Sequence, residues 1–409
     1  MNNRNGSAGE LKLPLEGIRV VEFGSLLAGP FSTRFFGDFG AEVIKVEAPD
    51  APDPMRDWGP AKYKGRALVW PIQSRNKKVV TINMRLPEGQ ELARRLIDKA
   101  DIVVENFRPG TMEKWGCGYA ELSKRNPGLI MIHVSGYGQT GRYRNRAGFG
   151  SAAGAMGGLR FLTGYPDRPP TRVGLSLEDS LGSLQAVIGG LLALRARELN
   201  GGKGQEVDVS ITEAVFAMTE GAIPEYALTG YIRQRQGSVL PGVAPSNIYQ
   251  AKDGIWMVIA ANADNVFKRL FTLMGMPEVA NNPKYMSHEG RWEDRDQLDQ
   301  WIADWAKNYT SAELDKMLEE AGVPAAPIYS AKEIYEDPYF WERESIIEVE
   351  DPELGKIPMP GVMPKLCGTP GQVRWTGPAR PGMHNEEVFL NVVGLTPQEL
   401  DDYRARGII

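Results

Sequence analysis

The stretch that decides the fold is residues 18–47, IRVVEFGSLLAGPFSTRFFGDFGAEVIKVE. Residues 18–23 and 41–47 are apolar runs of strand length, which predicts two β-strands. Between them, Pro30 stands in a favoured first-turn position and Gly40 follows the last residue of a helix-length segment, which predicts a helix. The stretch therefore predicts a strand, a helix and a second strand that form one βαβ unit.

The same alternation continues toward residue 135. Strands are predicted at residues 78–84 (KVVTINM), 101–107 (DIVVENF) and 129–135 (LIMIHVS), and a helix is predicted at 88–100. Strands that alternate with helices indicate a largely parallel sheet covered by helices. The predicted fold class is α/β.

Length and composition limit the classes of protein. A chain of 409 residues exceeds the length at which one hydrophobic core stops growing, so a large domain with a smaller partner is expected. A net charge of −5 argues against a dedicated nucleic-acid-binding protein. The N-terminus has no apolar segment of a secretory signal, and no apolar run is long enough to predict a membrane span.

Cysteine and histidine are scarce. Cys117 and Cys367 are too few and too far apart to indicate a disulfide framework, which favours a reducing compartment, and we expect a cytoplasmic protein. None of the three histidines has a second ligand at metal-binding spacing, so no metal site is predicted. Chemistry is therefore expected from carboxylates, backbone amides and a bound ligand.

The motif GYGQTG at residues 136–141 matches the GxGxxG pattern of dinucleotide-binding sites and follows a predicted strand. Such a site needs a helix that opens at the glycines and an acidic residue about 20 positions later. Here the chain continues as RYRNRAGFG without an amphipathic pattern. A glycine-rich loop that serves another ligand or a turn is the better interpretation.

Basic residues follow several predicted strands. Arg85 comes after residues 78–84, the segment ENFRPGTMEKWG comes after 101–105, and RYRNR follows 129–135. RYRNR alone is also compatible with a solvated loop. Ligands of open parallel sheets bind beyond the carboxyl ends of the strands, and arginine matches phosphate oxygens well. Three basic segments at such ends together suggest a phosphate-rich ligand.

Residues 174–184, GLSLEDSLGSL, place Glu178 and Asp179 at the start of an apolar helix predicted for 177–198. Helical phase predicts a core face of large side chains: Leu177, Leu181, Leu184, Ile188 and Leu191. The opposite stripe holds Asp179 and small residues: Gly182, Ser183, Ala186 and Gly190. Glu178 is expected to point toward Gln185 at the surface. Ser176 and Asp179 resemble a capping box, so geometry alone favours a cap for Asp179 over a catalytic group.

Five segments in order carry a family resemblance. They are residues 13–49, 74–89, 104–116, SGYGQTG followed by RAGF, and GLSLED followed by an apolar helix and KGQEVDVSITEA. Together they resemble the class III coenzyme A transferases, from about residue 14 to the end. This family also contains the α-methylacyl-CoA racemases, so both reactions are to be weighed.

The resemblance implies a Rossmann-like large domain made from both chain ends, a smaller domain between them, and two subunits interlocked as a homodimer. The corresponding boundaries are a flexible tail at 1–10, the large domain at 11–225, a linker and small domain at 226–330, and a return linker with the rest of the large domain at 331–409. It further implies that Asp179 is the catalytic nucleophile and that coenzyme A acts as substrate and covalent intermediate, with no permanently bound cofactor. The implied coenzyme contacts are Leu27, Ala28, Ile82, Asn83, Met84, Arg85, Asn106, Phe107, Arg108, Thr111, Lys114, Asn145, Arg146, Ala147 and Gly148.

Three positions depart from the family pattern. Ser25 and Leu27 stand where some members have His and Gln, and Ala48 stands where some have Arg. Arg56 is the candidate to replace that arginine. Phe149 stands where the racemases have a histidine, and phenylalanine cannot exchange a proton, which favours acyl transfer over racemisation.

The resemblance is closest to members that use succinyl-CoA and small dicarboxylic acids such as malate, citramalate or itaconate. The candidate partners for the free carboxylate of the acid are Arg233, Arg235 and Arg75, and the 240–245 loop is the candidate source of oxyanion-stabilising amides. The other interpretations are a racemase-like enzyme and a non-catalytic acyl-CoA-binding protein on the same scaffold.

Overall fold

The computed structural model describes residues 11–409, so the predicted tail at 1–10 lies outside the described residues. The chain forms two compact units. Among the described residues, the first unit contains residues 11–159, Val173–Ile223 and Tyr339–Ile409, and the second contains Arg160–Arg172 and Pro224–Pro338. The two chain ends therefore fold together, with the second unit inserted between them in sequence.

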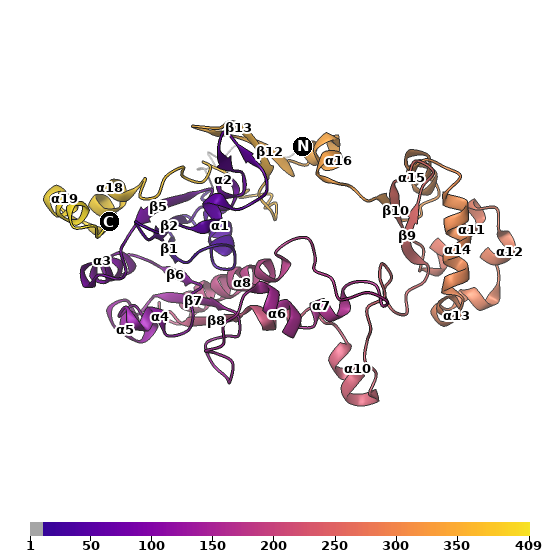
Figure 1. Ribbon diagram of the computed structural model, residues 1–409, viewed down its shortest axis with the longest axis horizontal. Coiled ribbons are helices and arrows are strands. Elements are labelled where there is room, and N and C mark those ends of the chain that lie inside the picture. The colour runs from indigo at the N-terminus through magenta and orange to yellow at the C-terminus, as the bar shows by residue number, and fades with distance from the viewer. Residues whose placement is uncertain (1–10) are drawn as a thin grey trace, which may run out of the picture. The chain divides into compact units, whose positions relative to one another are not determined.

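A six-stranded sheet organises the first unit, in the order β5-β2-β1-β6-β7-β8 (Figure 1). Its strands are β1 Arg19–Phe23, β2 Glu42–Glu47, β5 Lys77–Thr81, β6 Ile102–Glu105, β7 Ile130–Ser135 and β8 Glu206–Ser210. All five pairings are parallel, which confirms the predicted α/β class. The strand order reverses between β1 and β6, as in doubly wound folds, so a ligand crevice is expected beyond the ends of these two strands.

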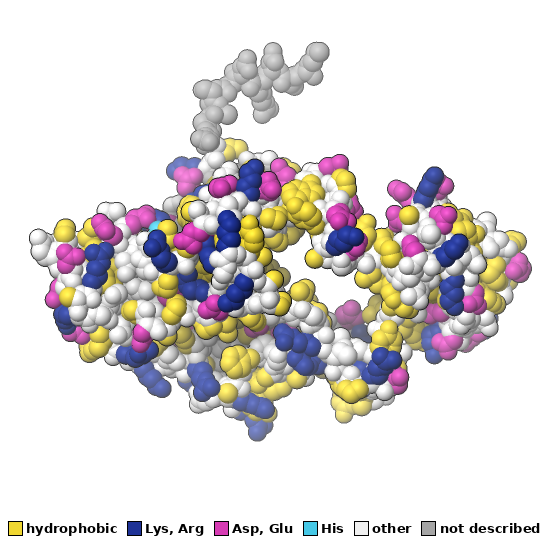
Figure 2. Space-filling view, turned by 45° about the horizontal axis from the view of Figure 1, so that its top comes forward, with side chains coloured by type: hydrophobic (Ala, Val, Ile, Leu, Met, Phe, Trp, Pro, Cys, Tyr) yellow, Lys and Arg dark blue, Asp and Glu magenta, His cyan; other side chains and the backbone are white. Residues whose placement is uncertain are grey.

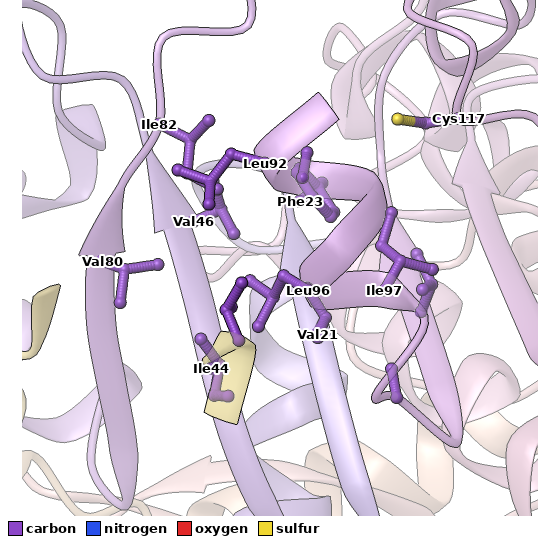
Figure 3. Packing of buried hydrophobic residues seen from close by; sticks show 14 of the residues in the cluster. Val21, Phe23, Ile44, Val46, Val80, Ile82, Leu92, Leu96, Ile97 and Cys117 are labelled. Atoms are coloured by element: carbon purple, nitrogen blue, oxygen red, sulfur yellow. The ribbon is translucent and has the colours of Figure 1, made fainter. Parts of the chain in front are cut away.

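Each face of the sheet has its own hydrophobic core, because successive strand residues point to opposite faces. One face packs against α3 Pro87–Ile97 and the C-terminal segment, with Val21, Ile44 and Leu96 completely buried. Figure 3 shows this packing of α3 on the strands. The other face packs against α1 Pro30–Asp38 and α8 Leu177–Leu199, with Val20, Phe36 and Ala186 in the core.

Helix α8 packs with the face opposite to the one that helical phase predicts. Its small side chains, among them Gly182, Ala186 and Gly190, are buried, whereas Leu184 and Ile188 are 41% and 50% exposed. The reason is close approach: a β-carbon on Gly190 would lie 2.8 Å from Phe36 Cζ of α1. By length and composition α8 could also cross a membrane, but its buried stripe is typical of a core helix.

The remaining elements of the first unit are short. The helices are α2 Val69–Gln73, α4 Thr111–Lys114, α5 Tyr119–Arg125, α6 Gly150–Met156, α9 Ile211–Phe216, α18 Asn385–Val388 and α19 Pro397–Ala405, and the hairpin strands are β12 Ile346–Asp351 and β13 Gly355–Pro360. Helix α19 begins with a capping box formed by Thr396 and Glu399. Helices α7 Leu159–Leu162 and α10 Ala222–Thr229 span the boundaries between the units.

The second unit is built on a three-stranded antiparallel sheet, with β10 Trp256–Ala260 between β9 Ser246–Gln250 and β11 Ala325–Pro327. Helices α11 Asp264–Leu273, α14 Arg295–Ala306 and α15 Ser311–Glu320 contribute to its core. Alternation along β10 buries Met257 and Ile259 and leaves Trp256 and Val258 exposed. The second unit thus combines a small antiparallel sheet with helices that pack on it.

Candidate functional site

A pocket of about 290 Å³ lies at the carboxyl ends of β1, β2, β5 and β6, where the strand order reverses. It brings together five of the predicted coenzyme contacts: Ile82, Asn83, Met84, Arg85 and Phe107. The rest of its lining is Phe23, Gly24, Ser25, Val46, Glu47, Ala48, Ala51, Pro52, Asp53, Pro54 and Trp115. The other ten predicted contacts do not line this pocket: Leu27, Ala28, Asn106, Arg108, Thr111, Lys114, Asn145, Arg146, Ala147 and Gly148.

Phe107 and Trp115 form an aromatic wall of the pocket. Their rings meet edge to face, with centroids 5.2 Å apart. The amide of Phe107 donates a 2.7 Å hydrogen bond to the buried carboxylate of Glu105. Arg85 lies exposed at the edge, where its guanidinium pairs with Asp50 at 2.8 Å. An apolar pocket with a cation at its edge suits a ligand that combines a ring or alkyl chain with phosphate.

Asn106 joins the loops that follow β1 and β6. Its side-chain oxygen accepts a hydrogen bond from the amide of Ser25 at 3.1 Å, and its side-chain nitrogen donates to the carbonyl of Ser25 at 2.9 Å. Gly24 is required here, because a β-carbon on it would lie 2.2 Å from Asn106 Oδ1. Both polar atoms of the Asn106 side chain are thus hydrogen-bonded to the backbone of Ser25.

Leu27 and Ala28 belong to the loop after β1, and Ala28 is connected to α8. The Ser183 hydroxyl donates to the carbonyl of Ala28 at 2.6 Å and lies 2.8 Å from the carbonyl oxygen of Asp179. The connection runs through buried atoms, because both Ala28 and Ser183 are buried. The loop next to the pocket is therefore held against the first turns of the helix that carries Asp179.

The two neighbouring carboxylates on α8 both lie against α6. A β-carbon on Gly150 would be 2.6 Å from Asp179 Oδ2, and one on Gly154 would be 2.5 Å from Glu178 Oε1. Asp179 is half-buried, and Glu178 is only 2% exposed, so the predicted surface position of Glu178 is wrong. Contact with α6 takes the Glu178 side chain away from the solvent side of α8.

Half of the predicted capping box is missing at the start of α8. Ser176 is the N-cap residue, but its side chain makes no capping hydrogen bond. Asp179 lies in the first turn of α8, where the helix N-terminus carries a partial positive charge. A carboxylate at a helix start can act as a nucleophile, and the missing side chain of Gly150 is what lets the Asp179 carboxylate lie this close to α6.

The glycine-rich segment 136–149 is a loop, and helix α6 begins only at Gly150. Gly136 and Gly148 meet at its base, where a β-carbon on Gly136 would lie 3.1 Å from the α-carbon of Gly148. The exposed Arg146 lies over the rings of Tyr137 and Tyr143, at 5.7 and 5.5 Å. Phe149, at the racemase histidine position, is 73% exposed. His133 is packed in the sheet beside Glu105 and is 2% exposed.

Two arginines that the sequence offers for ligand binding, Arg75 and Arg56, are instead bonded within the protein. Arg75 is only 1% exposed and pairs with Asp38 at 2.7 Å, so it is not accessible to a substrate acid. The guanidinium of Arg56 pairs with Glu47, donates to the carbonyls of Pro378 and Ala379 and stacks on a tryptophan ring. It therefore forms part of the protein framework instead of replacing a coenzyme-binding arginine.

The other two arginine candidates belong to the second unit, as does the 240–245 loop. Arg233 pairs with Glu225, and Arg235 donates to the carbonyls of Tyr165 and Arg168. Among residues 11–409, no group of three or more His, Cys, Asp or Glu residues is placed to hold a metal ion.

Sequence reasoning missed the charged residues around the loop after β1. Glu22 and Lys45 are fully buried within their strands, and Asp53 is buried beside the pocket. The available signal was a charge inside each apolar run, VVEF and VIKV, where a buried strand normally has none.

The fold and the site define a doubly wound α/β protein with a pocket at the sheet reversal and a carboxylate at the start of a long helix. Residues 15–385 match the model of CoA-transferase family III. The chain is 55% identical to the succinyl-CoA–D-citramalate CoA-transferase of Chloroflexus aurantiacus, over 97% of this chain and 98% of that protein. It is 39% identical to the beta subunit of the succinyl-CoA–L-malate CoA-transferase of the same organism, over 97% and 98% of the two chains.

A solved structure agrees. The crystal structure of a CAIB/BAIF family protein from Brucella suis superposes with a TM-score of 0.81 at 32% identity, over 92% of this chain and 99% of that chain. The chain belongs to CoA-transferase family III. It is an enzyme that handles coenzyme A as a substrate, which confirms the resemblance in the sequence.

Proposed function

We propose that this enzyme transfers coenzyme A from succinyl-CoA to a small dicarboxylic acid, with Asp179 as the nucleophile. The observation that carries the proposal is the position of the half-buried Asp179 carboxylate in the first turn of α8, packed against Gly150 at the start of α6. The substrate class is supported by the 55% identity to a transferase whose name gives succinyl-CoA and D-citramalate.

In the first half-reaction, an oxygen of Asp179 attacks the thioester carbonyl of succinyl-CoA. The carbon–sulfur bond breaks, which gives a mixed anhydride and the coenzyme thiolate. The thiolate then attacks the aspartyl carbonyl, and succinate leaves. The product is an aspartyl-CoA thioester, which conserves the energy of the original thioester.

In the second half-reaction, a carboxylate of the acceptor acid attacks the aspartyl-CoA thioester and releases the thiolate again. The thiolate attacks the acceptor's carbonyl in the new anhydride, so that the acceptor leaves as its CoA ester and the Asp179 carboxylate is restored. No net proton is taken up or released. Backbone amides of the 240–245 loop are our candidate for stabilising the tetrahedral oxyanions.

We further propose that coenzyme A uses the pocket at the sheet reversal. The pocket's aromatic and apolar wall matches the uncharged parts of the coenzyme, and Arg85 at its edge matches a phosphate. The predicted contacts of Arg108, Lys114 and Arg146 would add cations outside the pocket. All three side chains are exposed in the single chain.

The active form proposed is a homodimer. Exposed hydrophobic side chains on α8 and on the second unit support this, because isolated subunits rarely expose so many. Figure 2 shows hydrophobic side chains, in yellow, at the surface among Lys and Arg side chains.

The nucleophile can be tested by trapping. Wild-type enzyme, Asp179→Ala and Glu178→Gln are incubated with succinyl-CoA and then treated with hydroxylamine or borohydride. The mass of the peptide that contains residue 179 is then measured by mass spectrometry. We expect an adduct on Asp179 in the wild type and in Glu178→Gln, and none in Asp179→Ala, whose CoA exchange falls by at least about 10³-fold.

Equal CoA exchange by wild type and Asp179→Ala, without any adduct in the wild type, would falsify the mechanism. Exchange of the α-proton of a methyl-branched acyl-CoA without acyl exchange would instead indicate a racemase. Binding of succinyl-CoA without either reaction would indicate a non-catalytic binding protein.

A further inference from the structure

Three charged side chains are buried together under the loop that follows β1. Glu22 of β1 forms ion pairs with Lys45 of β2 at 2.6 Å and with Lys77 of β5 at 2.8 Å. None of the three side chains is exposed to solvent. The hydroxyl of Thr33 in α1 also donates to Glu22. The cluster therefore satisfies the charge of Glu22 from two strands and one helix.

The two lysines also reach both ends of the loop formed by residues 24–30. Lys45 Nζ donates to the carbonyl of Gly24 at 2.8 Å, and Lys77 Nζ donates to the carbonyl of Pro30 at 2.6 Å. Charge-assisted hydrogen bonds of this kind are short and directional. The cluster thus fixes the position of the loop's first and last residues relative to three strands.

The middle of the loop is held by Asp53, which pairs with Lys45 at 2.9 Å. Asp53 accepts a hydrogen bond from the amide of Leu26 at 3.0 Å. Leu26 has a backbone φ of +64°, a conformation that L-residues other than glycine rarely adopt. Such a conformation persists only where several surrounding contacts hold it. Here the contacts are the hydrogen bond from Leu26 to Asp53 and those between Asn106 and Ser25.

Stability alone does not explain a cluster of this kind. Desolvation of buried charges is costly, and well-packed apolar residues of similar size often give equal or greater stability. What apolar residues cannot give is a set of directed hydrogen bonds to the carbonyls of Gly24 and Pro30. The benefit of the cluster is therefore the geometry of the loop.

We propose that Lys45 and Lys77 are positioning residues for coenzyme A: they hold residues 24–30 in the binding conformation before the ligand arrives. The loop lines the pocket at Gly24 and Ser25, and its residue Ala28 is bonded to Ser183 on the helix of Asp179. Its position consequently sets the distance between the coenzyme and the nucleophile. This inference rests on the proposed use of the pocket by coenzyme A.

The first test compares two double variants that each remove one buried ion pair without a change in net charge. Glu22→Gln with Lys77→Met removes the Glu22–Lys77 ion pair and the hydrogen bond from Lys77 to the carbonyl of Pro30. Asp38→Asn with Arg75→Met removes an equally buried pair whose other side-chain polar contacts are to Asn76, Met359 and the carbonyls of Pro360 and Gly361, and none of these is to residues 24–30. For each enzyme, the urea midpoint, the Kd for succinyl-CoA by calorimetry, and kcat and KM are measured.

We expect both double variants to lose stability and only the first to lose ligand affinity. Its Kd and KM for succinyl-CoA should rise at least tenfold, whereas those of the control stay within twofold of the wild type. An equal change in Kd for both variants, or no change for either, overturns the positioning role. A wild type that does not bind succinyl-CoA at all would instead reject the proposed function.

The second test needs no variant and so does not depend on folding of a mutant. Hydrogen exchange of the wild type is measured with and without coenzyme A for the amides of Ser25 and Leu26, which bond to Asn106 and Asp53. If the loop is preformed, both amides are protected in the free enzyme, and the ligand slows their exchange less than threefold. Rapid exchange in the free enzyme that becomes slow on binding would show that the ligand orders the loop, which contradicts the inference.

Discussion

At the scale of single residues, Glu178 and Asp179 show how one helical step separates two carboxylates. Both lie against α6, but Glu178 meets Gly154 and is buried, whereas Asp179 meets Gly150 at the first residue of that helix and is half-buried. A residue that must react with a thioester needs access and a polar environment at the same time. Of the two carboxylates, Asp179 is the accessible one, because Glu178 is only 2% exposed.

The contact between the Asp179 carboxylate and Gly150 predicts that a side chain at position 150 lowers activity. In Gly150→Ala, the new methyl group would lie 2.6 Å from Asp179 Oδ2, so the carboxylate must move. Because a displacement of about 1 Å can cost 10²-fold in rate, we expect kcat to fall by about that factor. Alanine is the better helix former, so the melting temperature should not fall. Ser151→Ala, an exposed position on the same helix, is the control and should keep normal kcat. Normal kcat in Gly150→Ala would mean that the carboxylate does not react from this position.

At the scale of elements, α8 has two apolar faces that could each pack against another part of a protein. The stripe of small side chains packs on the sheet and α1, and the face with Leu184, Ile188 and Leu192 is left 41%, 50% and 65% exposed in the single chain. Both faces are thus apolar, which is why helical phase could not tell which one enters the core. An uncovered face of this kind fits the interface of the proposed homodimer.

We therefore predict that charge on this face weakens the dimer. Ile188→Lys combined with Leu192→Lys should raise the dissociation constant of the dimer at least tenfold, because buried interface positions tolerate lysine poorly. Light scattering after size exclusion, over a range of protein concentrations, measures the effect. Glu198→Gln, an exposed change on the same helix, is expected to leave the dimer intact. The interface is located elsewhere if the double lysine variant dimerises as tightly as the wild type.

At the scale of the whole molecule, the parallel sheet brings distant charges into one buried cluster. Burial opposes ionisation of Glu22, but Lys45 and Lys77 together lower its pKa from 4.5 to about 2. A carboxyl group whose pKa is lower in the folded than in the unfolded state stabilises the fold above its unfolded pKa. That stabilisation is lost as the pH falls from about 4.5 through about 2.

Glu22→Gln should accordingly cost about 3 kcal/mol of unfolding free energy at pH 7, as expected for a shift of this size. The gap between variant and wild type should shrink as the pH falls from 4.5 toward 2, because wild-type Glu22 then becomes neutral too. Urea unfolding at a series of pH values measures this. The control Glu91→Gln breaks an exposed pair with Arg94 and should cost less than about 1 kcal/mol at every pH. A gap that stays constant down to pH 2 would show that the charge of Glu22 is not what stabilises the fold.

The sequence by itself determined the alternation of strands and helices, the parallel sheet and the position of Asp179 at a helix start. These features depend on local periodicity, on Pro30 and Gly40, and on an ordered set of motifs, all of which are visible without contacts. The sequence also placed Ile82, Asn83, Met84, Arg85 and Phe107 at strand ends, and parallel strands bring such ends together at one edge.

Only the tertiary structure decided which face of α8 is buried, where Glu178 points, and which arginines are free. Arg75 and Arg56 look like available cations in the sequence, but residues far along the chain, at 360–361 and 378–379, accept their hydrogen bonds. Likewise, Gly190 enters the core because Phe36 of α1 comes within reach of it. Such outcomes depend on close packing and on pairing of buried charges between distant segments, and local sequence patterns do not record either.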